Sequence, residues 1–358
     1  MSRLLIYGAN GYTGRLVARE AARRGMKPLL AGRNRDDLDA LAKELGAPRR
    51  VFELSNPAEI ARNLDGVNVV LHCAGPFSKT AAPMLDACLN VNAHYLDITG
   101  EIDVFELCHR THSRAQHQGT VVLPGSGFDV VPTDCLAAML KRQLPDATSL
   151  VLAFEAGGGP SPGTAITSVE GLARGGRARI GGEVKQVPLA WKAREFLRDG
   201  KPRTAMTIPW GDVYTAFVST GIPNIETYMA VPPKTIQRLR LMRHIQPLLA
   251  LRPVQNFMKR RVLAATPGPS EQRRRDSGCH VWGEVRNAAG KQVGLELQTP
   301  NGYDLTVTAA LGIAESLLSR TSPPAGGYFT PSQLMGADYV IKLPGVRLID
   351  SAAVAVSD

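Results

Sequence analysis

Short apolar runs alternate with amphipathic stretches from residue 3 to residue 124, and this alternation constrains the fold more than any other feature of the sequence. The strand-like runs are Leu4–Tyr7, Pro28–Ala31, Arg50–Leu54, Val67–His72, Tyr95–Ile98 and Thr120–Leu123. Helices are expected between them over Tyr12–Arg24, Asp36–Leu45, Pro57–Leu64, Ala82–Leu89 and Ile102–Gln116. Because parallel strands need crossover connections, the pattern predicts a parallel sheet with helices on both faces.

Three glycines at three-residue spacing follow the first strand: Gly8, Gly11 and Gly14. The first permits a tight turn, the second lets the backbone approach a diphosphate, and the third lets the next helix pack closely on the strand. The positive end of that helix then faces the phosphates. The sequence therefore predicts a doubly wound Rossmann sheet with a dinucleotide site. Its expected cofactor-binding residues at this turn are Gly8, Ala9, Asn10, Gly11, Tyr12, Thr13 and Gly14.

The residues after the second strand indicate which dinucleotide binds. An acidic residue there would bind the ribose 2′-hydroxyl of NAD, but the sequence has Arg33 and Asn34. A guanidinium suits the 2′-phosphate of NADP. We therefore expect NADP in preference to NAD, with Arg33 and Asn34 in its site; the alternative is that Arg33 is simply a solvated surface residue.

A small-residue corner follows the fourth strand, at the carboxyl end where open α/β sheets bind ligands. We expect it to let the backbone approach the nicotinamide side of the cofactor, although it also fits a plain turn. Its residues are Cys73, Ala74, Gly75 and Pro76.

The chain has 358 residues, which suits two domains, and its pattern changes after Asp146. Short β-like runs broken by glycine and proline fill residues 148–231. Further elements are expected as strands over Val281–Val285, Gly294–Gln298 and Thr306–Ala309 and as a helix over Gly312–Leu318. We expect a dinucleotide domain over residues 1–146 and an α+β substrate or dimerisation domain, with a mostly antiparallel sheet, over 147–318. Residues 319–358 are expected to pack back on the first domain.

Hydride transfer to an acceptor also needs a proton donor. Asp97 and Glu101 follow the fifth strand and Asp129 follows the sixth, so all three are candidate catalytic residues on the cofactor side of the sheet. The structural alternatives are that Glu101 caps the helix from Ile102 and that the nearby Asp134 occupies the first turn of a helix near Pro132.

Two tyrosines offer phenolic alternatives as proton donor. Tyr12 better fits a wall of the cofactor site, and Tyr214, in a strand-like run, better fits the core.

The net charge of +10 is concentrated in one segment of the chain. Between Pro232 and Arg275 there are 11 Lys or Arg residues and one acid, Glu271, so this segment alone carries +10. Its central part, Lys234–Arg261, mixes these bases with Leu, Ile and Met. It fits either a solvated helical surface or a peripheral membrane contact that admits a lipid-like substrate. Few aromatic residues accompany the charge, so we expect no nucleic-acid partner.

The five cysteines are scattered, which fits reduced thiols and a cytoplasmic protein, with peripheral membrane contact as an open alternative. No apolar run of about 18 residues predicts a membrane-spanning helix, and Met1–Tyr7 lacks the features of a secretory leader. Cys108, His109, His112 and His117 cluster without a second ligand pair, so no metal site is expected. The expected partners are a small-molecule or lipid-like substrate and a second copy in a homodimer.

Several motifs, taken in order, resemble the saccharopine dehydrogenase-like oxidoreductases, a family that includes the mycobacterial trans-acting enoyl reductases. The matching pieces are Gly8–Gly14, Ala31–Arg33, Cys73–Phe77, Tyr95–Glu101, Pro124–Asp134, Gly163–Ala165, Trp210–Asp212, Ser219–Asn224, Val281–Val285, Thr299–Tyr303 and Gly336–Asp338. The resemblance implies a Rossmann domain, an α+β domain and NAD(P)-dependent redox chemistry, without implying saccharopine as substrate.

The function expected from this resemblance is reduction of a C=C (enoyl), C=N or carbonyl group in an unidentified, lipid-like substrate. The alternative is a non-catalytic NADP-binding protein that senses redox state or acts as a scaffold at membranes.

Overall fold

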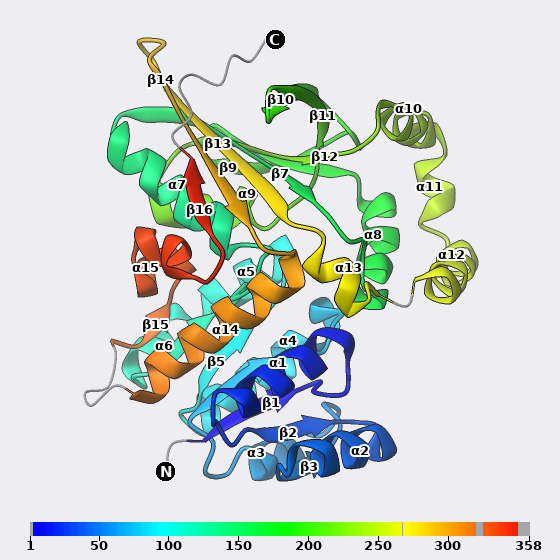
Figure 1. The fold of residues 1–358 in the computed structure, drawn as a ribbon, viewed down its shortest axis with the longest axis vertical. Coiled ribbons are helices and arrows are strands. Elements are labelled where there is room, and N and C mark those ends of the chain that lie inside the picture. The colour runs from blue at the N-terminus through cyan, green and yellow to red at the C-terminus, as the bar shows by residue number, and fades with distance from the viewer. Residues whose placement is uncertain (1–2, 267, 320–324, 350–358) are drawn as a thin grey trace. The chain divides into compact units, whose positions relative to one another are not determined.

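The computed structural model describes residues 3–266, 268–319 and 325–349. Two compact units are present (Figure 1). Within the described residues, the first contains residues 3–131, 303–319 and 325–335, and the second contains residues 132–266, 268–302 and 336–349.

The sheet of the first unit is parallel throughout. Its strand order is β15-β6-β5-β4-β1-β2-β3. The strands are β1 (Leu4–Tyr7), β2 (Leu29–Gly32), β3 (Arg49–Val51), β4 (Val69–His72), β5 (His94–Asp97), β6 (Val121–Leu123) and β15 (Gly327–Tyr328). The order 3-2-1-4-5-6 is that of a doubly wound dinucleotide-binding sheet, so the predicted fold class is confirmed.

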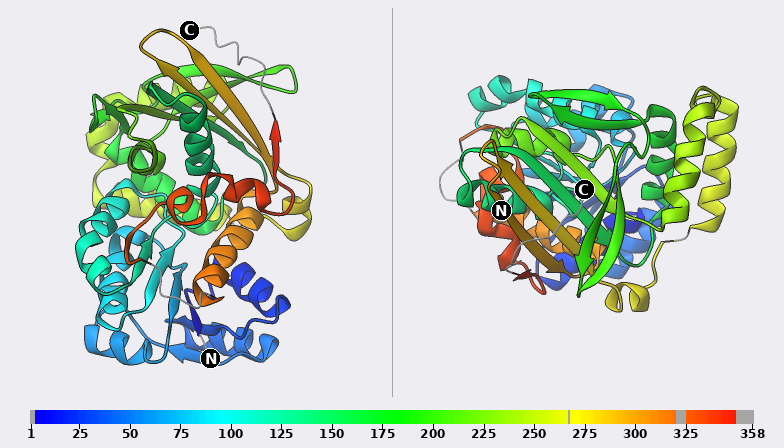
Figure 2. Two further views of the ribbon diagram at one scale, coloured as in Figure 1. Left: turned by 90° about the vertical axis from the view of Figure 1, so that its left-hand side faces the viewer. Right: turned by 90° about the horizontal axis from the view of Figure 1, so that it is seen from above.

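Helices cover both faces of this sheet. They are α1 (Tyr12–Arg23), α2 (Arg35–Leu45), α3 (Pro57–Asn63), α4 (Phe77–Asn90), α5 (Ile102–Arg110), α6 (His112–His117), α14 (Gly302–Ser319) and α15 (Pro331–Met335). Figure 2 shows α1 and α14 on one side of the strands and the helices from α4 to α6 on the other. An ion pair of 3.2 Å between Arg24 of α1 and Glu315 ties α14 to the first unit.

The strand predicted over Thr306–Ala309 is wrong, because these residues lie inside α14. Their β-branched side chains favour a strand locally, but this preference is weak beside tertiary packing. Leu305, Ala309 and Ile313 are fully buried, so helix packing decides the local structure. The helix predicted over Gly312–Leu318 is the second half of the same element.

The boundaries of the compact units differ from the domain limits expected at residues 146 and 318. Helix α7 (Val131–Gln143) lies almost wholly in the second unit, whereas residues 303–319 and 325–335 belong to the first. Strand β15 pairs with β6 of the first unit, but β16 (Arg347–Ile349) pairs with β14 of the second. The C-terminal segment is therefore shared between the units, because pairing partners distant in sequence decide where each piece lies.

The second unit is built on a nine-stranded mixed sheet, mostly antiparallel as predicted. Its only parallel pair within the described strands is β7 with β12. The strands, besides β16, are β7 (Ala147–Ala156), β8 (Gly176–Ile180), β9 (Glu183–Val187), β10 (Ala193–Arg198), β11 (Lys201–Thr207), β12 (Asn224–Ala230), β13 (Cys279–Asn287) and β14 (Gln292–Thr299).

The remaining helices of this unit are α8 (Pro162–Arg174), α9 (Asp212–Thr220), α10 (Pro233–Met242), η1 (Arg243–Ile245), α11 (Gln246–Leu249), α12 (Arg252–Ala265), α13 (Glu271–Arg275) and η2 (Ala337–Lys342). Tyr214, expected in a strand-like run, lies in α9 and is half-buried. The guanidinium of Arg179 lies over the rings of Tyr214 and Phe217, at 5.8 and 4.1 Å from their centroids.

The core of the second unit includes a cluster around Trp282 of β13. Its ring packs with Phe196 and its indole N–H donates to the Leu197 carbonyl at 2.8 Å, so the one polar group of this buried ring has a partner. No helix among the described residues is both long and apolar enough to cross a bilayer.

Candidate functional site

The candidate site lies at the carboxyl edge of the first unit's sheet. Because all strands of this sheet are parallel, the segments that follow β1, β2, β4, β5 and β6 emerge at the same edge. These segments, together with Asp97 at the end of β5, carry the predicted cofactor-binding residues and the three candidate carboxyl groups, whereas Tyr214 lies in α9 of the second unit.

The glycine turn after β1 has the geometry that its spacing predicts. Gly8 has a φ of +80°, a left-handed conformation that favours glycine. Its N–H donates to the Ala31 carbonyl at 2.8 Å, and the Gly11 N–H donates to the Gly8 carbonyl at 2.9 Å. A Cβ on Gly14 would overlap the Gly8 carbonyl and lie 2.8 Å from its carbon. Only glycine at position 14 therefore lets α1 approach the turn this closely.

The N-terminus of α1 begins directly after this turn. Gly11 is the N-cap residue and has no side chain to cap the helix, and it is exposed. Ala9 and Gly14 are buried within the turn, whereas Asn10, Tyr12 and Thr13 are half-buried. The ring of Tyr12 packs edge-on against Tyr303 of the same unit, with centroids 4.9 Å apart. The exposed part of the turn is thus its backbone together with the start of a helix, the geometry that binds phosphate.

The corner after β4 lies against the same turn. A Cβ on Gly8 would lie 2.8 Å from Ala74 Cβ, and the Cys73 N–H donates to the Tyr7 carbonyl at 2.8 Å. The Gly75–Pro76 peptide bond is cis, and Gly75 is exposed. Burial, followed by the nearby Asp97, raises the pKa of the Cys73 thiol to about 12, so this side chain is a neutral part of the wall.

His72 supports this corner through hydrogen bonds, a role that could not be predicted from the sequence pattern. Its Nε2 lies 3.0 Å from Thr80 Oγ1, and the Thr80 hydroxyl donates to the Ala74 carbonyl at 2.7 Å. Burial lowers the pKa of His72 to about 3, so the imidazole is neutral. A neutral imidazole can donate from Nε2 to the Thr80 oxygen and so fix the corner.

Arg33 and Asn34 follow β2 and are both exposed. Within the described residues Arg33 forms no ion pair, so its guanidinium is available to an external anion. The Asn34 side chain caps α2: its Oδ1 accepts from the Asp37 N–H at 3.3 Å and its Nδ2 donates to Asp37 Oδ2 at 2.7 Å. Of the two predicted residues, Arg33 has the side chain suited to a phosphate, whereas Asn34 positions α2.

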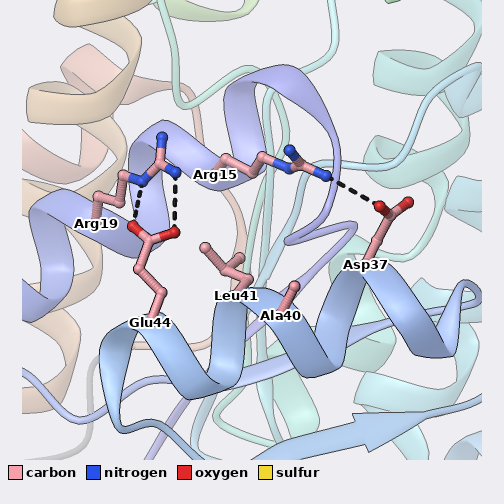
Figure 3. Close-up of a pocket in the computed structure, with 6 residues that line it drawn as sticks. All are labelled: Arg15, Arg19, Asp37, Ala40, Leu41 and Glu44. Atoms are coloured by element: carbon pink, nitrogen blue, oxygen red, sulfur yellow. Dashed lines mark hydrogen bonds and ion pairs between the residues drawn. The ribbon is translucent and has the colours of Figure 1, made fainter.

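Arg15 is a positioning residue that sequence reasoning missed. Its Nε donates to the Asn10 carbonyl at 2.9 Å and its Nη2 pairs with Asp37 at 3.3 Å. Arg15 and Arg19 line a small hollow between α1 and α2, where Arg19 makes a parallel ion pair with Glu44 at 2.7 Å (Figure 3). Both arginines join the same helices, and Arg15 also holds the carbonyl of the glycine-turn residue Asn10.

Replacing Arg15 by alanine should weaken NADPH binding by roughly 5- to 30-fold, because the turn loses a charge-assisted hydrogen bond of about 1–2 kcal/mol. Arg19→Ala is the matched control, because it removes the exposed ion pair with Glu44, of about 0–1 kcal/mol, between the same two helices. Isothermal titration of both variants with NADPH measures the difference. Equal affinities for the two variants would show that Arg15 does not hold the turn.

Asp97 is fully buried and its carboxylate joins two strand ends. It accepts from the Tyr95 hydroxyl at 2.7 Å, the Thr99 N–H at 3.0 Å and the Gly125 N–H at 2.9 Å. Burial raises the pKa of Asp97 to about 6, although these three donors oppose the rise. The three hydrogen bonds favour the ionised form, so Asp97 is better placed to hold the segments after β5 and β6 than to release a proton.

Glu101 caps a helix other than the one expected. Its Oε1 accepts from the Phe77 N–H at 2.8 Å and its Oε2 accepts from the Ser78 N–H at 3.0 Å. The carboxylate thus satisfies the first turn of α4, which begins at Phe77 and not at the predicted Ala82. Glu101 follows β5 but fixes the loop after β4, on the nicotinamide side of the expected site.

Asp129 is the candidate carboxyl group whose pKa lies nearest neutrality. It lies beside Gly100, where an added Cβ would be 3.0 Å from Asp129 Oδ2, and it keeps some solvent exposure. Burial raises the pKa of Asp129 to about 7. A carboxyl group with this pKa is protonated in a large share of molecules at neutral pH, as a general acid requires.

Asp134 lies in the first turn of α7, as the structural alternative predicts. It is fully buried and accepts a short hydrogen bond from the Ser219 hydroxyl. Its side chain is therefore occupied within the second unit.

Two histidines of the Cys108–His117 cluster contact strand β15. His112 Nδ1 accepts from the Tyr328 N–H at 3.1 Å, and the rings of His109 and Tyr328 stack with centroids 4.6 Å apart. In the part of the chain that the structure describes, no group of three His, Cys, Asp or Glu side chains is arranged to hold a metal ion.

Residues 4–123 match the family model described as the saccharopine dehydrogenase NADP binding domain. The saccharopine dehydrogenase-like oxidoreductase of Homo sapiens is 29% identical over 171 residues, which cover 42% of this chain and 40% of that protein. The trans-acting enoyl reductase of Mycobacterium ulcerans is 29% identical over 151 residues, which cover 39% of this chain and 35% of that protein. The matches span less than half the length of these curated relatives.

Two solved structures resemble the chain over almost its whole length. The apo saccharopine dehydrogenase (L-Glu forming) of Saccharomyces cerevisiae has a TM-score of 0.64 and 10% identity, covering 98% of this chain and 100% of that one. The homospermidine synthase of Legionella pneumophila, in complex with NAD, has a TM-score of 0.63 and 10% identity, covering 98% and 92%. At these identities the likeness shows a shared fold.

Proposed function

We propose that the chain is an NADP-dependent oxidoreductase, because residues 4–123 match the family model described as the saccharopine dehydrogenase NADP binding domain. The observation that carries this proposal is the closely packed glycine turn at the start of α1, with Arg33 exposed on the neighbouring strand end. Gly8, Gly11 and the first turn of α1 would hold the diphosphate, and Arg33 the 2′-phosphate.

The residues of this site fit the cofactor on structural grounds. Side chains at positions 8 and 14 would fill space that the turn needs, and the exposed backbone at Gly11 leaves room for a phosphate group. NADPH supplies a hydride when bound. The chain's own part is to bind and orient the cofactor and to hold a proton at Asp129 for the acceptor.

The proposed reaction is reduction of a C=C, C=N or carbonyl group. The trans-acting enoyl reductases among the relatives make an enoyl group the first substrate class to test. We place the reaction in the cytoplasm, because all five cysteines are free thiols, as a reducing compartment maintains.

Arg33→Ala should weaken NADPH binding by about 10- to 100-fold and leave NADH binding within about twofold, because a charge-assisted contact to the 2′-phosphate contributes roughly 1.5–3 kcal/mol. Lys27→Ala is the control, since Lys27 is an exposed base at the opposite end of β2. Fluorescence titration with both coenzymes measures the selectivity. A wild-type protein that prefers NADH would contradict the assignment of NADP.

The activity is tested by following NADPH oxidation at 340 nm with enoyl, imino and carbonyl substrates of increasing acyl length. Turnover with one class, lost in Arg33→Ala at subsaturating NADPH, supports the proposal. Tight NADPH binding with no turnover across all three classes would favour a redox sensor and overturn the assignment as an enzyme.

A further inference from the structure

The outer surface of the segment from α10 to α12 is unusually apolar for an exposed part of the chain. The described residues contain eight exposed large hydrophobic side chains, and six of them lie here. They are Leu241, Ile245, Leu248, Leu251, Phe257 and Leu263. Leu241 is 70% exposed and Phe257 is 63% exposed. Exposed apolar side chains gathered on one surface commonly mark an interaction site.

These helices have an inner face that already packs on their own unit. Ile236 and Leu249 are buried, and Val254 and Met258 of α12 are half-buried. Both Figure 1 and Figure 2 show α10 and α12 as an outer row beyond α8. The exposed leucines and Phe257 therefore belong to a second, outward face, which the packing of the second unit leaves in solvent.

The same surface is strongly basic. Residues 234–261 contain eight Lys or Arg residues and no acid. Three of these bases bind within the unit: Lys259 pairs with Glu170 of α8 at 2.6 Å, and Arg240 and Arg243 donate to the Ala190 carbonyl. Among the described residues, no acidic partner neutralises the exposed bases Lys234, Arg238, Arg252 and Arg260.

From this combination we propose that the outer surface of α10–α12 docks on an anionic phospholipid bilayer. Leucine and phenylalanine side chains enter the boundary between headgroups and acyl chains, and the surrounding bases contact lipid phosphates. A second copy of the chain is a poorer occupant, because a two-fold interface would place like charges opposite one another. Nucleic acid is also a poorer occupant, because Phe257 is the segment's only aromatic residue among many exposed aliphatic ones.

The test is co-sedimentation of the full chain with vesicles of phosphatidylglycerol and phosphatidylcholine, and with vesicles of phosphatidylcholine alone. The wild type should bind the anionic vesicles at least tenfold more strongly. Arg238→Gln/Arg252→Gln/Arg260→Gln should lose about fivefold in partition coefficient for each base removed. Lys27→Gln/Lys43→Gln/Lys291→Gln removes the same charge from exposed positions outside the segment and should retain binding.

A second variant separates lipid insertion from charge attraction. Leu241→Gln/Leu248→Gln/Phe257→Gln should reduce binding at least about tenfold and abolish the fraction that survives 0.5 M salt. Unchanged thermal stability and NADPH affinity show that each variant is folded, independently of the proposed redox function.

Three results would overturn the proposal. They are no binding of the wild type to anionic vesicles at low salt, equal loss of binding in the two charge variants, and a lipid-free dimer that the apolar variant dissociates. The last result would identify the surface as a self-association interface.

Discussion

Placing a methyl group on Gly14 should abolish detectable NADPH binding, with a rise in Kd of at least about 100-fold. The added Cβ would overlap the carbonyl of Gly8 and lie 2.9 Å from Ala9 Cα, so α1 must move away from β1. That movement displaces the helix N-terminus from the phosphates and overpacks the core by about 1–3 kcal/mol. Calorimetric titration measures the Kd, and thermal unfolding measures the stability of the same sample.

Two further glycine variants distinguish loss of binding from loss of folding. Gly171 lies in α8, where an added Cβ meets no heavy atom within 4 Å, so Gly171→Ala should gain about 0.5–1 kcal/mol and bind NADPH normally. Gly11 is exposed and an added Cβ would lie 3.2 Å from the Gly8 carbonyl. Gly11→Ala should therefore fold but bind NADPH less tightly. If both Gly11→Ala and Gly14→Ala bound NADPH with wild-type affinity, the glycine turn would not be part of the cofactor site.

Replacing Asp129 by asparagine should lower kcat by about 10²- to 10⁴-fold on the substrate that the panel identifies, with NADPH affinity unchanged. Loss of a positioned general acid has an effect of this size. Because the pKa of Asp129 is about 7, wild-type turnover should fall as the pH rises through 7 and the carboxyl group loses its proton. Asp65→Asn, an exposed carboxyl group before β4, is the control and should retain full activity.

Stability provides a second readout for Asp129 that needs no substrate. Its pKa of about 7 in the folded protein lies above the ordinary value of 3.8, so the folded state holds this proton at higher pH than the unfolded chain does. The stability that the proton contributes is present below about pH 4 and is lost as the pH rises through 7. Asp129→Asn should therefore gain on the order of 2 kcal/mol relative to wild type between pH 5 and pH 8.

Urea unfolding at a series of pH values measures this difference between the two proteins. A pH-independent difference in unfolding free energy would show that the pKa of Asp129 is not raised. Retained turnover in Asp129→Asn, together with the expected stability difference, would instead show a raised pKa without a catalytic role.

The sequence predicted the first sheet well because its signals are local. Strand β1 has the predicted bounds, and the other five predicted strands lie within about three residues of theirs. Each strand is a short apolar run that ends in a turn, so its pattern depends on neighbours in the chain. The start of α4 was placed five residues too late, because its cap comes from Glu101, 24 residues away in sequence.

Secondary structure in the second half of the chain was harder to predict, because the intrinsic strand propensity of some residues there disagrees with the element that tertiary packing favours. Tyr214 and the Thr306–Ala309 run have residues that favour strands, yet both lie in helices. Likewise, the sequence did not indicate which unit each C-terminal segment joins, because β15 and β16 pair with strands of different sheets.

The sequence alone determined the parallel sheet, the glycine turn and the edge at which Asp97, Glu101 and Asp129 stand, because strand alternation and glycine spacing carry that information along the chain. Only the tertiary structure decided what each carboxyl group does. Three hydrogen-bond donors surround Asp97, two amides of α4 bind Glu101, and burial leaves Asp129 with a pKa near neutrality. Protonation depends on desolvation and on partners brought in from distant segments, and neither can be read from the order of residues.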